Sequence, residues 1–127
     1  MSGMEQLAVA LREEGGLLAD ALAPVPAGEP LLDGIGDERA LVLAAVREGY
    51  LLHYAEGRAV RTEDADLALL GGDRLYALGL ARLARAGDLD AVARLADLIS
   101  DCARAHAEND LAAADAAWHV TASAFRR

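Results

Sequence analysis

The side chains best suited to chemistry in this chain are its single cysteine and its three histidines. Cys102 lies four residues before His106, and Asp115 lies four residues before His119. On a helix, residues four apart share one face, and such pairs can bind a metal ion. Cys102 and His106, however, continue an apolar stripe, where a thiol usually packs as a small hydrophobic group. We therefore interpret this pair as core and predict no metal site.

Acidic residues that could bind Mg²⁺ gather between Glu63 and Asp66. Thr62 directly before them is typical of a helix N-cap, and the helix dipole favours carboxylates in the first turn. Two aspartates at this position are too few for a Mg²⁺ cluster. No serine or cysteine lies in a recognisable nucleophile motif. The sequence thus predicts no catalytic residue and no cofactor in this chain.

The composition predicts an all-α fold. Alanine and leucine dominate the 127 residues, whereas the β-branched and aromatic residues that strands favour are scarce. The length suits one domain with a real core. The high aliphatic content also predicts more apolar surface than one small core can bury, which favours association with a partner.

Charge and cysteine content argue against several classes of function. The formal net charge of −9 disfavours nucleic-acid binding, which needs a positive surface, and disfavours attraction to an anionic membrane. The longest apolar runs are too short to span a bilayer, so we predict that this is not an integral membrane protein. A single cysteine without a recognisable signal peptide is typical of the reducing cytoplasm.

Hydrophobic periodicity predicts about five helical segments joined by short connections, which favours a compact antiparallel bundle. The segments cover about residues 4–22, 38–56, 63–86, 89–106 and 111–125. Gly15-Gly16 is a possible weak point in the first segment, and the prolines after it end the helix. We treat the chain as a single helical domain, with an N-terminal helix and Pro/Gly connector over 1–36 and the bundle over 37–127.

Three glycines inside the third segment need an explanation. Gly71, Gly72 and Gly79 each cost a helix about 1 kcal/mol relative to alanine. A missing Cβ lets another backbone approach closely. The sequence therefore predicts that this helix is crossed tightly by a neighbour, and the segment 38–56 is the first candidate.

Two stretches of the sequence carry a resemblance to a known enzyme family. The first is LVLAAVREGYLLHYAEG, an apolar run that leads into Leu51-Leu52-His53. The second is LALLGGDRLYALGLARLARAGDLDAVARLADLI, in which Gly72-Asp73 precedes an apolar helix. Their order and spacing resemble consecutive helices of the trans-polyprenyl diphosphate synthases over about residues 41–99. The resemblance implies that the bundle is half of an isoprenoid-synthase fold.

That family holds Mg²⁺ between two aspartate-rich clusters that this chain lacks. After His53, where the first cluster should follow, stand Tyr54 and Ala55, and Glu56 alone could not replace it. The family's arginine-containing stretch is shortened to RAVRTED, and the second cluster would lie beyond the C-terminus. The resemblance thus implies the small, first component of two-component hexaprenyl or heptaprenyl diphosphate synthases, whose larger catalytic partner holds the Mg²⁺.

The resemblance also implies roles for individual side chains. A small component would stabilise the catalytic subunit and help wall the tunnel that sets product length, with Tyr50, Tyr54, Tyr76 and Leu80 as candidate wall or contact residues. Asp73 would be a scaffold residue and not a metal ligand. An alternative stays open, namely a self-associating helical scaffold, a homodimer of isoprenoid-synthase descent that binds an apolar ligand or none.

Overall fold

The fold is all-α, as the composition predicts. A computed structural model describes residues 1–24 and 28–127, and within them the chain forms six α-helices, one short 3₁₀ helix and no strand. Pro26 of the predicted connector lies outside the described residues. In chain order the elements are α1 (Gly3–Glu14), α2 (Leu17–Asp20), the 3₁₀ helix η1 (Pro30–Leu32), α3 (Asp37–Tyr54), α4 (Ala65–Arg85), α5 (Leu89–Ala107) and α6 (Leu111–Phe125).

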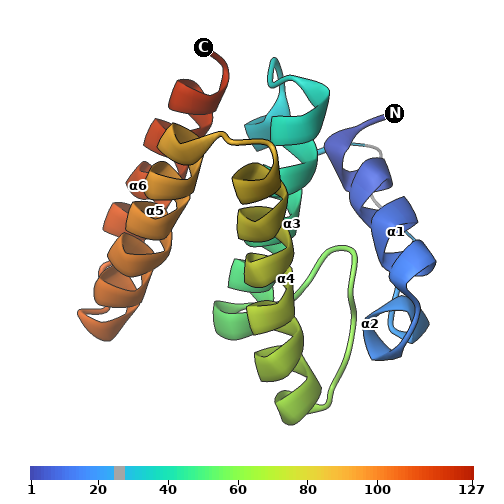
Figure 1. Cartoon of the computed structure of the whole chain (residues 1–127). Coiled ribbons are helices and arrows are strands. Elements are labelled where there is room, and N and C mark those ends of the chain that lie inside the picture. The colour runs from blue at the N-terminus through green and yellow to red at the C-terminus, as the bar shows by residue number, and fades with distance from the viewer. Residues whose placement is uncertain (25–27) are drawn as a thin grey trace.

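The first predicted segment is divided into two helices, which is why the structure has six and not about five. Gly15 and Gly16 have φ of 71° and 83°, in the left-handed region that glycine tolerates, and the chain turns there between α1 and α2. α1 packs against α3 with Met4, Leu7 and Leu11 buried. The N-terminal helix is therefore part of the bundle and not a separate arm (Figure 1).

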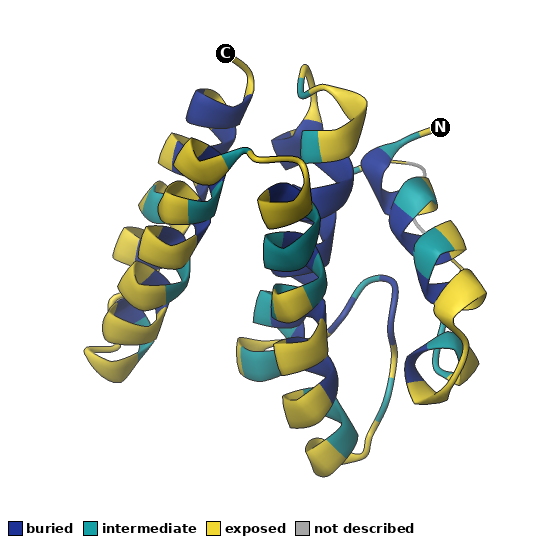
Figure 2. Cartoon of the chain, in the orientation of Figure 1, coloured by how far each residue is buried: buried dark blue, intermediate teal, exposed yellow. Residues whose placement is uncertain are grey.

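α3 is the central helix of the bundle. Every side chain from Leu41 to Val46 is buried, because other helices cover α3 on several sides (Figure 2). α3 and α4 form one antiparallel hairpin, and α5 and α6 form a second beside it (Figure 1). The apolar residues on nearly all faces of α3 are the sequence signature of such a position.

Aspartates cap three of the helices. The side chains of Asp64, Asp88 and Asp110 accept hydrogen bonds from backbone N–H groups in the first turns of α4, α5 and α6. The prediction of Thr62 as the cap of α4 was wrong, because its hydroxyl accepts from the N–H of Asp64, ahead of the helix. Gly87 follows α4 with φ of 75°, a left-handed conformation typical of helix ends.

A buried carboxylate fixes the loop between α3 and α4. Glu48 is 1% exposed, and its Oε2 accepts hydrogen bonds from the N–H groups of Ala59 and Val60, each at 3.0 Å. Burial raises the pKa of Glu48, and the hydrogen bonds oppose that shift. Val60 also forms an isolated bridge with Leu22. The loop thereby ties the N-terminal segment to the α3–α4 hairpin.

Candidate functional site

The predicted tyrosines gather with two histidines and a tryptophan in one group, which we call the aromatic cluster and which comprises Tyr50, His53, Tyr54, Tyr76, His106 and Trp118. Four helices contribute to it. The rings of Tyr50 and Tyr54, one turn apart on α3, have centroids 5.2 Å apart. Tyr50 also lies 5.3 Å from the ring of Trp118 on α6, and His53 lies 5.1 Å from that of Tyr76 on α4. The cluster therefore joins both hairpins of the bundle.

His106 of α5 is held by two tyrosines. Its Nε2 lies 2.7 Å from the hydroxyl of Tyr50, and its ring stacks on Tyr54 with centroids 4.0 Å apart and planes 8° from parallel. Burial raises the pKa of Tyr50, so its hydroxyl keeps its proton and can donate it to Nε2. Nε2 and one face of the imidazole are thus held by this arrangement.

Arg47 of α3 lies against two rings of the aromatic cluster. Its guanidinium carbon is 4.9 Å from the ring centroid of Trp118 and 5.2 Å from that of Tyr50, within the range of cation–π attraction. In the described part of the chain, Arg47 Nε and Trp118 Nε1 are buried without a hydrogen-bond partner. Burial raises the pKa of the neighbouring Cys102 thiol to about 11, although Arg47 opposes the shift. The thiol is therefore protonated and unreactive at neutral pH.

His53 and Asp73, which belong to the most specific elements of the family resemblance, are in contact. Nε2 of His53 on α3 lies 3.2 Å from Oδ1 of Asp73 on α4 and 3.1 Å from the backbone oxygen of Leu69. The side chain of His53 is only 13% exposed, whereas that of Asp73 is 65% exposed. Gly72 makes the contact possible, because a Cβ at this position would overlap the imidazole ring.

The glycines of α4 are positions of close approach to other elements. A Cβ on Gly79 would lie 2.8 Å from a valine methyl of α3, and a Cβ on Gly49 of α3 would lie 2.7 Å from the backbone oxygen of Gly72. The two helices thus pack backbone against backbone. Gly71 faces a different element, since its Cβ would lie 2.8 Å from a methyl of Leu18 in α2.

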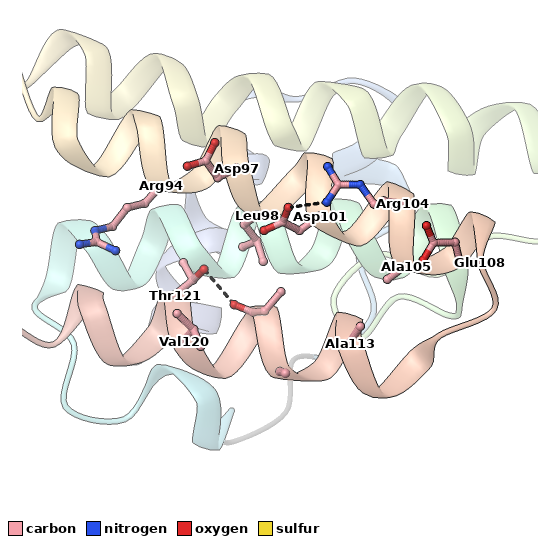
Figure 3. A pocket seen from close by; sticks show the side chains of 12 residues that line it. Arg94, Asp97, Leu98, Asp101, Arg104, Ala105, Glu108, Ala113, Val120 and Thr121 are labelled. Atoms are coloured by element: carbon pink, nitrogen blue, oxygen red, sulfur yellow. Dashed lines mark hydrogen bonds and ion pairs between the residues drawn. The ribbon is translucent and has the colours of Figure 1, made fainter.

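Leu80, the fourth predicted contact residue, lies one turn beyond Tyr76 on α4 and is half-buried against the core. A groove of about 650 Å³ lies elsewhere, between α5 and α6, and none of the four predicted residues lines it (Figure 3). Residues 1–24 and 28–127 contain no group of three His, Cys, Asp or Glu side chains that could hold a metal ion. Asp115 and His119 do pair, at 3.5 Å, but both are exposed.

Sequence reasoning missed Arg47 and His106 as members of this site. Arg47 precedes Tyr50 by three residues, so helical spacing places both on one face of α3, and this is a signal that the sequence carries. His106, by contrast, lies 56 residues from Tyr50 along the chain. No local pattern indicates which distant helices will meet.

No protein-family model, curated protein or solved structure matches this chain. Within the described ranges, no helix combines the length and the apolar character needed to cross a membrane. The all-α architecture is observed in the structure, whereas its relation to the isoprenoid-synthase fold stays a prediction.

Proposed function

We propose that this chain is a non-catalytic small subunit of a heteromeric polyprenyl diphosphate synthase. Its sequence resembles that family over about residues 41–99, yet Tyr54 and Ala55 stand where the first aspartate-rich cluster should begin. The larger partner would supply both clusters and would hold the Mg²⁺ that neutralises the diphosphate. This chain would stabilise the partner's helices and limit the length of the growing polyprenyl chain.

The observation that carries the proposal is the contact between His53 and Asp73. These residues come from the two separate stretches that resemble the family, and the α3–α4 hairpin brings their side chains to 3.2 Å. The contact depends on Gly72, which belongs to the same pair of residues as Asp73 in the resemblance. The residues that distinguish the resemblance are thus neighbours in one packed unit, which supports a scaffold role for them.

The aromatic cluster offers a surface for the partner. Tyr54 is 40% exposed although its ring stacks on His106, and Tyr50, Tyr76 and Leu80 are half-buried. Aromatic side chains provide large contact areas at a low cost in conformational entropy. Their bulk would also limit a growing apolar chain, because atoms cannot overlap in a close-packed interior.

We place this subunit in the cytoplasm, as part of the same proposal. Its only cysteine, Cys102, is a buried free thiol. Free thiols persist in the reducing cytoplasm, where disulfides are rare.

The proposal is tested by co-purification from the source organism. An affinity-tagged chain is purified and the bound proteins are identified by mass spectrometry. We expect a larger chain that carries both aspartate-rich clusters, with Mg²⁺-dependent prenyl transfer by the complex. Tyr54→Ala removes exposed contact area and should weaken binding by about tenfold, which corresponds to about 1.4 kcal/mol. Tyr54→Phe keeps the ring and serves as the matched control.

Two results would contradict the proposal. One is release of diphosphate from an allylic substrate by the pure chain without any other protein. The other is recovery of a folded chain, verified by circular dichroism, to which no protein with aspartate-rich clusters is bound.

A further inference from the structure

The α5–α6 hairpin carries a groove on the side turned away from the core. Its walls come from both helices and enclose about 650 Å³ (Figure 3). The α5 side is charged, and the α6 side is formed mainly by alanines and by Val120, which is 65% exposed. The groove is therefore a shallow apolar strip with a charged border along α5.

The charges on that border follow the spacing of a helix face. Arg94, Asp101 and Glu108 repeat every seven residues, which is two helical turns, and all three line the groove. Asp97 and Arg104 lie between them on the same side. The row of charges begins with the positive Arg94 and ends with the negative Glu108, so its two ends have opposite sign.

Three of these five charged residues have no ion-pair partner in the part of the chain that the structure describes. In residues 1–24 and 28–127, none of Arg94, Asp97 and Glu108 forms an ion pair, whereas the exposed Asp101 and Arg104 lie 3.6 Å apart. The open ends of the charged border are thus available to an outside partner of the opposite sign. One partner that matches both ends at once is the same helix running in the opposite direction.

We propose that this groove binds the same groove of a second copy of the chain, with the two α5 helices antiparallel about a two-fold axis near Asp101. In this arrangement Arg94 faces Glu108 of the second copy, and Asp97 faces Arg104 of the second copy. By symmetry each pair forms twice, as in any isologous interface. Complementary charges of this kind fix the register of two helices.

The α6 side of the groove allows the close approach that these pairs need. Ala113, Ala116 and Ala117 present only methyl groups there, so an incoming helix meets little side-chain bulk. Val120 lies in the same strip and would lose its exposed surface to the second copy. Burial of this strip supplies an apolar contribution that the charged pairs alone lack.

The axis places the two Asp101 carboxylates near one another. Each keeps Arg104 of its own chain at 3.6 Å, which offsets part of the repulsion. Replacing Asp101 with asparagine removes the remaining like-charge contact and should therefore strengthen the dimer. A structural role for Asp101 within one chain predicts no such gain.

This inference does not rest on the proposed function. The aromatic cluster lies at the meeting of both hairpins, whereas the groove lies between α5 and α6 on the opposite side of that hairpin from the core. A dimer through the groove leaves Tyr54 free to meet another protein, so the two proposals fail separately.

A charge-swap experiment on the full chain tests the groove. The molar mass is measured by sedimentation equilibrium for the native chain, for Arg94→Glu and for the double variant Arg94→Glu with Glu108→Arg. We expect a dimer for the native chain, a dissociation constant raised at least about tenfold in the single variant, and recovery in the double variant. Both positions in the design are exposed side chains, and circular dichroism checks that each variant is folded.

The inference is overturned if the native chain sediments as a monomer at every concentration reached. It is also overturned if Arg94→Glu dimerises as tightly as the native chain, or if the double variant fails to recover while folded. Asp101→Asn provides a second measurement, in which a weakened dimer would contradict the placement of the axis.

Discussion

The two sides of the central helix α3 are packed by different kinds of residue. Toward α4, α3 presents Gly49, and the facing residues are Gly72 and Gly79. An added Cβ at any of the three would meet backbone, imidazole or methyl atoms below 3 Å. Toward α5 and α6, α3 presents Arg47 and Tyr50, whose rings and guanidinium reach Trp118 and His106. The contact with α4 depends on glycines that allow close approach, whereas the contact with α5 and α6 depends on large aromatic and arginine side chains.

This difference explains why a chain rich in good helix formers keeps glycines inside α3 and α4. Each glycine weakens its own helix by about 1 kcal/mol. In return α3 and α4 approach closely enough for backbone atoms and His53 to pack without a gap. The α5–α6 hairpin lies further from α3, so large side chains fill the space between them and carry its polar contacts.

Trp118→Ala is expected to have the largest effect on stability. Removing a fully buried tryptophan leaves a cavity and takes away the ring that contacts Arg47 and Tyr50. Truncations of this kind cost about 3–5 kcal/mol of unfolding free energy. Urea denaturation measures the loss of unfolding free energy. Trp118→Phe keeps an aromatic ring and should lose less. If Trp118→Ala lost less unfolding free energy than Gly49→Ala, large side chains would not be the main stabilising contact between α3 and the α5–α6 hairpin.

Gly49→Ala tests the opposite side and should cost about 1–3 kcal/mol, as overpacked sites do. The added Cβ would lie 2.7 Å from the backbone oxygen of Gly72 and 2.9 Å from the ring of Tyr76. Because the first contact is with backbone, relief requires α3 and α4 to separate. Gly28→Ala is the matched control, since a Cβ there meets no atom of residues 1–24 and 28–127 within 4 Å. Equal unfolding free energies for the two variants in denaturant would argue against close packing.

Glu48 forms a third kind of contact, in which one buried carboxylate joins α3 to a loop. Burial raises its pKa above the ordinary value of 4.5 in the folded chain. Between 4.5 and the raised value the folded state binds more protons than the unfolded state, so stability falls as the pH rises through this window. We expect the unfolding free energy of the native chain, minus that of Glu48→Gln, to be largest at low pH and to decline through this window.

The Glu48 effect is the smallest of the three, and it is a change of unfolding free energy with pH. It is measured by denaturant titrations of both chains over the same pH series. A difference that grows with pH would mean that the hydrogen bonds from Ala59 and Val60 outweigh burial and lower the folded pKa.

Much of the fold could be predicted from local patterns. The scarcity of β-branched residues, the apolar stripes and the capping residue Asp88 predict helices at the observed places, because each depends on residues within a few positions. The division at Gly15-Gly16 is visible as a weak point, but glycine permits a positive φ without requiring it. Thr62 and Asp64 are both good N-caps, and only the surrounding loop decided between them.

For the candidate site, the sequence predicts the residues that α3 contributes. It does not predict the residues on other helices that they contact. The sequence by itself determined that Tyr50 and Tyr54 lie on neighbouring turns, and that α4 has glycines where a neighbour can approach. The stacking of His106 on Tyr54 and the contact of Gly71 with α2 depend on the tertiary structure. So does the position of the α5–α6 groove, which none of the four predicted contact residues lines. The physical reason is that helical periodicity fixes which residues share a face, whereas the choice of the opposing face depends on the packing of the whole chain.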